Sequence, residues 1–218
     1  SWCRMKDNMY CREIPWDDNT YRLDAWKNGQ TGYPYIDACM MQLKTEGWIH
    51  HLGRHAVACF LTRGDLWQSW ERGAEHFESH LLDADYGLNG FNWLWLSCSG
   101  FFYQYFRCYS PVAFQKKNDP SGTYIRKFLP VLAKLPNTYI YEPWKAPAAV
   151  LKTAGIKLGV DYPRPIVDHS VVSKENMSKM ADAYAKHKAK AAESSGASPK
   201  QPPKKKTKRA TKQTKLKF

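Results

Sequence analysis

The sequence predicts an all-α domain, and three observations support this prediction. Apolar residues recur with helical spacing through residues 1–185, which are rich in aromatic side chains. Short runs of β-branched residues, which would indicate strands, are rare there. Glycine and proline separate the apolar segments at intervals, as expected at helix ends. With 218 residues and 43% hydrophobic content, the chain can bury one sizeable core.

Six segments of this domain have the pattern of helices. They are residues 35–45, 48–62, 66–82, 93–105, 124–132 and 176–190. The first two read as amphipathic or buried helices. The third carries Trp67 and Trp70 three residues apart, which predicts neighbouring indoles on one helix. The fourth is almost entirely apolar, which predicts a helix in the core.

The composition changes at Lys186. From there to Phe218, twelve Lys and Arg face one Glu, so this segment carries +11 of the total charge of +13. It has no large apolar residue before Leu216 and cannot bury enough surface to offset chain entropy. We therefore expect residues 186–218 to form a disordered basic tail. Its Lys204–Arg209 run indicates a nuclear localisation signal read by an import receptor, or non-specific DNA affinity.

Two further classes of protein are disfavoured. No run of about 18 uncharged apolar residues exists, so no membrane span is expected. The six cysteines lie far apart and include no C-x-x-C pair. This spacing argues against a disulfide framework or a metal site and favours reduced thiols.

His51 and His55 are four residues apart, so on a helix both imidazoles project from one face. They could simply be surface histidines or core histidines with satisfied hydrogen bonds. A zinc site is a second alternative, but the metalloprotease pattern requires a Glu after the first His, and none is present. Chemically, imidazole can give and take a proton near neutrality.

Downstream of the histidines, two carboxylates lie near a carboxamide and several indoles. These residues are Asp83, Asp85, Asn89, Trp67, Trp70, Trp93 and Trp95. Tryptophans at helical spacing are usually core residues when considered alone. The full set instead suits photochemistry on a buried aromatic cofactor, because indoles relay electrons and polar groups tune a redox centre.

Taken in order, the motifs between Arg4 and Lys188 resemble the C-terminal half of the flavin-binding domain of the cryptochrome/photolyase family. Within that family the chain is similar to the (6-4) photolyase and animal-type cryptochrome branch. The motifs are WIHHLGRH (48–55), DLWQSW (65–70), LLDADYGLN (81–89), NWLW (92–95), TGYPYIDA (31–38), FRCYSP (106–111), YIRKFLP (124–130) and YEPW (141–144).

The resemblance implies FAD as the cofactor. Arg54 and Asp83 match the residues of an ion pair beside the isoalloxazine ring. Asp85 matches a residue that forms a hydrogen bond with the polar edge of that ring. Asn89 matches the position that faces flavin N5. A carboxamide there can accept from N5–H of a reduced flavin or donate to the unprotonated form. Photolyases have Asn at this position, and so do vertebrate-type clock cryptochromes.

The resemblance also implies roles for the histidines and tryptophans. His51 and His55 match the pair that faces the lesion in (6-4) photolyases and handles the proton. Trp93, Trp70 and Trp16 match the three indoles that carry an electron from the protein surface to photoexcited flavin. Trp67 matches a fourth, outermost member. These four form the expected tryptophan relay.

A lesion pocket and a DNA-binding face are implied as well. Trp95, Arg107 and Tyr109 match positions around a base that is flipped out of damaged double-stranded DNA. Four basic residues are candidate phosphate contacts, or else a solvated basic face: Lys116, Lys117, Arg126 and Lys127.

The function implied by the resemblance is light-dependent repair of (6-4) pyrimidine photoproducts, in which photoexcited reduced FAD donates an electron to the lesion. One alternative is a cryptochrome photoreceptor or circadian transcriptional regulator with clock or signalling partners, or a protein with both functions. An inactive truncated fragment is the third, because the family's N-terminal α/β domain and flavin-phosphate segment are expected to lie outside this sequence.

Overall fold

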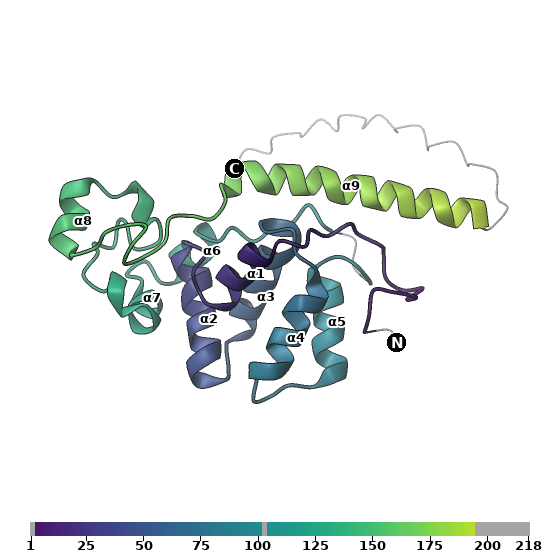
Figure 1. Ribbon diagram of the computed structural model, residues 1–218, viewed down its shortest axis with the longest axis horizontal. Coiled ribbons are helices and arrows are strands. Elements are labelled where there is room, and N and C mark those ends of the chain that lie inside the picture. The colour runs from purple at the N-terminus through teal and green to yellow at the C-terminus, as the bar shows by residue number, and fades with distance from the viewer. Residues whose placement is uncertain (1–2, 102–103, 195–218) are drawn as a thin grey trace, which may run out of the picture.

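The computed structural model describes residues 3–101 and 104–194, in which all the regular elements are helices (Figure 1). The α-helices are α1 (Thr20–Lys27), α2 (Pro34–Glu46), α3 (His51–Cys59), α4 (Trp70–His80), α5 (Tyr86–Leu96), α6 (Ala113–Asn118), α7 (Thr123–Phe128), α8 (Ala148–Ala154) and α9 (His169–Ser194). Three shorter helices are η1 (Phe60–Gly64), η2 (Pro130–Leu132) and η3 (Pro143–Lys145). Among the described residues there is no strand, only two isolated bridges. The all-α prediction is confirmed.

Local sequence sets the ends of the helices around the site. Helix α2 begins with Pro34 and ends at Gly47, whose φ of 64° lies in the left-handed region that glycine tolerates. Ser69 caps α4 by accepting a hydrogen bond from the Glu71 amide. The Asp85 carboxylate caps α5 by accepting one from the Leu88 amide. Two predicted site segments, 48–55 and 81–89, are therefore loops that lead into helices.

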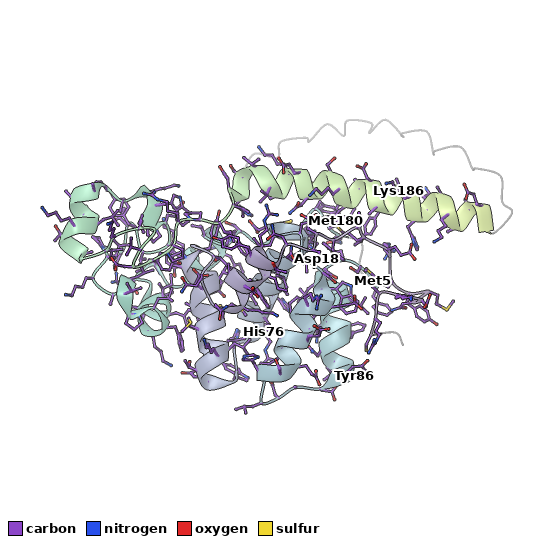
Figure 2. All side chains as sticks on the ribbon, viewed as in Figure 1. Met5, Asp18, His76, Tyr86, Met180 and Lys186 are labelled. Carbon is purple, nitrogen blue, oxygen red and sulfur yellow. The ribbon has the colours of Figure 1, made fainter. Side chains whose placement is uncertain are left out.

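The core lies between α2, α3, α4 and α5: α2 packs against α3, α3 against α5, and α5 against α4. Trp26, Trp70 and Trp93 are completely or almost completely buried in it. Helix α9 crosses one end of this bundle and packs on η1 (Figure 1). Met180 lies on the side of α9 that faces the other helices (Figure 2).

The prediction of one helix over residues 66–82 is wrong at its start. The chain leaves η1 at Gly64, and Trp67 has a left-handed φ of 57°. Gln68 forms a bridge with Asp17, and Ser69 then caps a new helix at Trp70. Trp67 and Trp70 are therefore on different elements, because capping and bridging override the apolar spacing.

The prediction of a core helix over residues 93–105 is also wrong in its bounds. Helix α5 starts earlier, at Tyr86, because Asp85 caps it, and it ends at Leu96. The Ser97 hydroxyl then donates to the Ser99 hydroxyl at 2.9 Å, and Cys98 has a φ of 56°. From Ser97 to Phe101 the chain therefore follows turns and bends, where hydroxyl groups compete with the helical hydrogen bonds.

Helix α9 extends beyond both ends of the predicted segment 176–190 and passes the predicted tail boundary at 186. Its last turns are exposed, yet they are rich in Ala and Lys, which favour helix without a core partner. Residues 195–218, including Lys204–Arg209, lie outside the described residues. Within the described part, no helix has the length and apolar character needed to cross a membrane.

Candidate functional site

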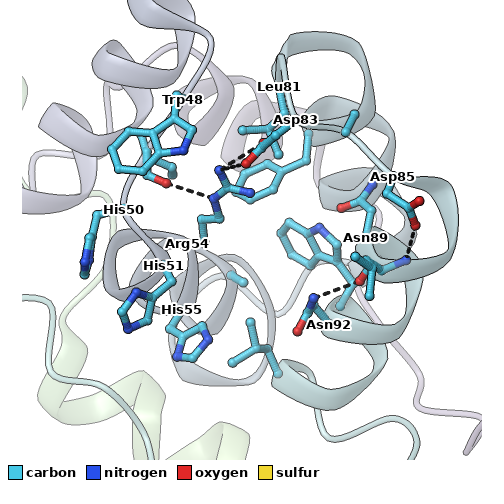
Figure 3. A pocket seen from close by; sticks show the side chains of 17 residues that line it. Trp48, His50, His51, Arg54, His55, Leu81, Asp83, Asp85, Asn89 and Asn92 are labelled. Carbon is cyan, nitrogen blue, oxygen red and sulfur yellow. Dashed lines mark hydrogen bonds and ion pairs between the residues drawn. The ribbon is translucent and has the colours of Figure 1, made fainter.

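A cavity of about 420 Å³ opens between the start of α3 and the segment that leads into α5 (Figure 3). The structure brings together in its lining all six residues predicted for the cofactor and the proton: His51, His55, Arg54, Asp83, Asp85 and Asn89. Trp93 and Phe77 supply aromatic surface, and Trp48 lines it as well. This space is the first cavity.

Arg54 and Asp83 form the predicted ion pair. Arg54 Nη2 lies 3.0 and 2.9 Å from the two carboxylate oxygens, and its Nε donates to the Ile49 carbonyl at 2.8 Å. The Arg54 side chain is 24% exposed and that of Asp83 is 51% exposed. Because Nε is bonded to a backbone carbonyl and Nη2 to a carboxylate, the guanidinium of Arg54 is held in one orientation at the cavity wall.

Asp85 and Asn89 are both held by the protein. One oxygen of Asp85 accepts from the Leu88 amide at 2.7 Å as the cap of α5. Asn89 Nδ2 donates to the Ala74 carbonyl at 2.9 Å and to a carboxylate oxygen of Glu78 at 3.0 Å. Sequence reasoning missed Glu78, which carries no motif and lies eleven residues before Asn89.

The two histidines lie on one face of α3, as their spacing predicted. Their ring centroids are 5.9 Å apart, and the His50 ring lies 4.2 Å from that of His51. Burial lowers the pKa of His55, and the charge of His51 lowers it further. His55 is therefore neutral near pH 7 and can accept a proton.

A second cavity of about 310 Å³ adjoins the first. Its lining includes the three predicted lesion residues Trp95, Arg107 and Tyr109, together with Arg63, Leu96 and Cys108. Leu96 lines both cavities. His55 joins them: its Nδ1 is 3.3 Å from the Tyr109 hydroxyl, and its ring lies 5.4 Å from that of Trp95.

Arg63 shapes the second cavity, and sequence reasoning did not identify it. It is 3% exposed and donates to the Leu96 carbonyl at 2.8 Å and the Tyr105 carbonyl at 2.7 Å. These bonds tie the turn after α5 to η1. The missed signal is a charged residue directly after the predicted helix 48–62, whose charge needs partners when it is buried.

The four tryptophans of the expected relay lie in two groups. Trp93 lines the first cavity and packs against α4, where a Cβ on Gly73 would lie 2.2 Å from its ring. Trp70 lies on α4 about one turn before Gly73. Trp16 and Trp67 are in contact, with ring centroids 4.8 Å apart.

Trp67, which the resemblance makes the outermost member of the relay, is buried in this structure. It is 1% exposed, because it packs in a cluster with Met180 and Ala183 of α9. Lys179 Nζ lies 5.0 Å from the centre of its ring.

The four basic residues proposed for DNA line neither of the two cavities. Lys116 is 3.8 Å from the Glu142 carboxylate, and Lys127 is 2.9 Å from that of Glu46. Arg126 donates to the Leu135 carbonyl at 2.7 Å, and so it holds its own loop. Lys117 is exposed and has no ion pair with a described residue.

The residues of the first cavity fit a flat conjugated ring. Its volume lies within the range of about 300–1,000 Å³ that is typical of ligand pockets. Aromatic surface and a fixed row of charged and amide groups face the same space, which suits a ring with one polar edge. No cluster of three metal-ligating side chains occurs among the described residues. Fold and cavity together indicate a helical domain with a site for a planar conjugated cofactor, as the resemblance to flavin-binding proteins implies.

Comparison with known proteins supports the assignment of a cofactor-binding helical domain. Residues 2–182 match the family described as the FAD binding domain of DNA photolyase. A (6-4) DNA photolyase of Oryza sativa subsp. japonica is 55% identical over 185 residues, covering 85% of this chain and 34% of the relative. Cryptochrome-2 of Gallus gallus is 55% identical over 181 residues, covering 83% and 31%.

The fold matches as well. A bacterial class III photolyase from Agrobacterium tumefaciens superposes with a TM-score of 0.76 at 38% identity, covering 79% of this chain and 36% of that structure. The chain belongs to the photolyase/cryptochrome family, and its cofactor is FAD. It spans about a third of the length of the curated relatives it matches.

Proposed function

We propose that this chain serves in light-dependent repair of (6-4) pyrimidine photoproducts in DNA. The observation that carries the proposal is His55, which lines the flavin cavity and contacts Tyr109 and Trp95 in the second cavity. A proton-handling group between a cofactor and an extruded base suits a reaction in which a group moves between two pyrimidines.

The residues divide the work between the two cavities. Arg54, Asp83, Asp85 and Asn89 would hold the isoalloxazine ring of FAD, which supplies an electron when it absorbs light. Trp95 and Tyr109 offer aromatic surfaces for a flipped base, and Arg107 offers a positive charge for a neighbouring phosphate. Neutral His55 accepts a hydrogen bond or a proton, and the exposed His51 lies beside it.

Damaged duplex DNA is the proposed substrate. Lys117 on α6 is the exposed candidate for a phosphate contact, and Lys116 would have to leave Glu142 to make one. The tail segment Lys204–Arg209 supports a proposal of nuclear import and a nuclear location.

The experiment is repair by the full-length protein carrying His55→Ala. A lost general acid or base typically costs about 10²–10⁴-fold in rate. We expect a loss in this range with binding to damaged DNA retained, measured by product formation under light and by a binding titration. Repair within tenfold of the wild-type rate would reject the role of His55.

A cryptochrome photoreceptor or clock function is the second candidate. The 55% identity to a cryptochrome, equal to that with a (6-4) photolyase, favours it. In that case clock or signalling proteins are the partners, and the wild-type protein would bind flavin without repairing DNA.

A further inference from the structure

The Asn89 carboxamide is held from outside the first cavity. Asn89 lines this cavity and also a shallow hollow on the outer face of α4 and α5, which Glu78 lines too. Its Nδ2 donates to the Ala74 carbonyl at 2.9 Å and to Glu78 Oε2 at 3.0 Å. A primary amide has two N–H bonds, so both are used on the α4 side.

Chemistry fixes which way this amide points. The Ala74 carbonyl and the Glu78 carboxylate are both acceptors, and a flipped amide would set Oδ1 against two oxygens. Glu78 is the stronger partner because hydrogen bonds to a charged group are shorter and stronger than neutral ones. The Ala74 carbonyl, by contrast, also belongs to the hydrogen bonds of α4. Of the two polar atoms of the Asn89 amide, Oδ1 is therefore the one that can accept a hydrogen bond from a ligand in the cavity. It has no hydrogen bond with a described residue.

We propose that Glu78 is a positioning residue that makes Asn89 an acceptor, and not a donor, toward the flavin. The inference rests on the proposed function, in which Asn89 lies beside ring nitrogen N5. A reduced flavin carries a proton on N5 and the oxidised ring does not. A fixed acceptor therefore stabilises the reduced ring selectively, and Glu78 removes the donor role that the sequence alone left open.

The decisive variant is Glu78→Lys, in which an acceptor is replaced by a group that can only donate. This change favours the flipped amide and weakens the acceptor at the cavity. Glu78→Gln keeps an acceptor oxygen but loses the charge, so its effect should be in the same direction as that of Glu78→Lys and smaller. Glu75→Lys is the matched control, because Glu75 is on the same helix, pairs with Arg72 at 3.7 Å and does not contact Asn89.

The first measurement is the ratio of reduced to oxidised flavin at a fixed applied potential in the full-length protein. Loss of one hydrogen bond is worth about 0.5–1.5 kcal/mol, so Glu78→Lys should lower this ratio by about two- to thirteenfold. An added positive charge alone acts in the opposite direction, because it favours the electron-rich reduced ring. A ratio that is unchanged or increased in Glu78→Lys relative to Glu75→Lys overturns the proposal.

The second measurement needs no flavin. In flavin-free full-length protein labelled with ¹⁵N-asparagine, the two side-chain N–H resonances of Asn89 should move in Glu78→Lys and stay in place in Glu75→Lys. Unmoved resonances in both variants overturn the positioning role. If the wild-type protein repairs no DNA but both readouts behave as expected, the proposed repair function fails and the role of Glu78 stands.

Discussion

Trp93 differs from the other indoles of the relay because it lines the flavin cavity. It is 2% exposed, and its ring packs on Phe77 at 5.1 Å and Trp26 at 6.2 Å. Gly73 provides the room, since any side chain there would overlap the ring. An indole so placed is the candidate for the electron-transfer step nearest the flavin.

The change Trp93→Phe should block photoreduction of the oxidised flavin in the full-length protein, because phenylalanine is far harder to oxidise than indole. Repair that starts from chemically reduced flavin should survive, since its electron comes from the flavin. Absorbance under continuous light measures the first quantity and product formation the second. Photoreduction at the wild-type rate would assign Trp93 to packing alone.

At this scale, the sequence predicts what depends on spacing along one element. The positions of His51 and His55 on one face of α3 follow from a four-residue interval. The contacts of Asn89 with Glu78 and of Arg63 with Tyr105 depend on how α4, α5 and η1 pack, which no local spacing encodes. The Arg54–Asp83 ion pair was predicted from the family resemblance and not from spacing.

At the scale of elements, α9 is attached to the bundle through Asp65. His169 Nδ1 is 2.7 Å from the Asp65 carboxylate, whose side chain is fully buried, and Asn176 Nδ2 donates to the Asp65 carbonyl at 3.2 Å. Burial lowers the pKa of His169, but the hydrogen bond and charge of Asp65 outweigh it, and the net pKa is raised. The sequence did not predict this anchor, because 104 residues separate the partners.

The raised pKa of His169 gives α9 a pH dependence. A histidine whose folded pKa exceeds its unfolded value near 6.5 adds stability below that value and loses the contribution as pH rises through the folded pKa. Burial also raises the pKa of Asp65, and the loss of stability from that shift begins as pH rises from the unfolded carboxyl value of about 3.9. Hydrogen exchange of the α9 amides should therefore quicken from pH 6 to pH 8, after correction for intrinsic rates.

His169→Gln tests this prediction. It should remove most of the pH effect on α9 exchange, while the amides of α2, which lies in the main core, stay unchanged as an internal control. An equal pH effect in the variant and the wild type would show that a group other than His169 causes the pH dependence of α9.

Boundaries of elements were predicted less well than their existence. The helices around residues 35–45 and 48–62 exist because apolar periodicity continues through them, whereas Trp67 escapes the pattern since a cap at Ser69 starts a new helix. Periodicity reports which side chains can be buried together. It does not report where a side-chain oxygen replaces a helical hydrogen bond.

At the scale of the whole molecule, charge is concentrated at the C-terminal end. Residues 195–218 contain nine Lys and Arg and no acidic residue, so they account for +9 of the net +13. The rest of the chain therefore lacks a strong charge excess, and its affinity for DNA must depend on where single cations lie. Residues 195–218 thus supply most of the net positive charge.

Removing residues 195–218 from the full-length protein should leave flavin binding and photoreduction unchanged, because the flavin cavity is formed without them. Binding to undamaged DNA should become less dependent on salt, since each lost phosphate contact reduces the slope of log affinity against log salt by roughly 0.9. Titrations at several salt concentrations measure the slope. A variant with the nine basic residues changed to Gln should match the deletion, and a shuffled tail of the same composition should match wild type.

The deletion should also move the protein from nucleus to cytoplasm, as seen by imaging a tagged form. Nuclear retention with an unchanged slope would leave the tail with neither role.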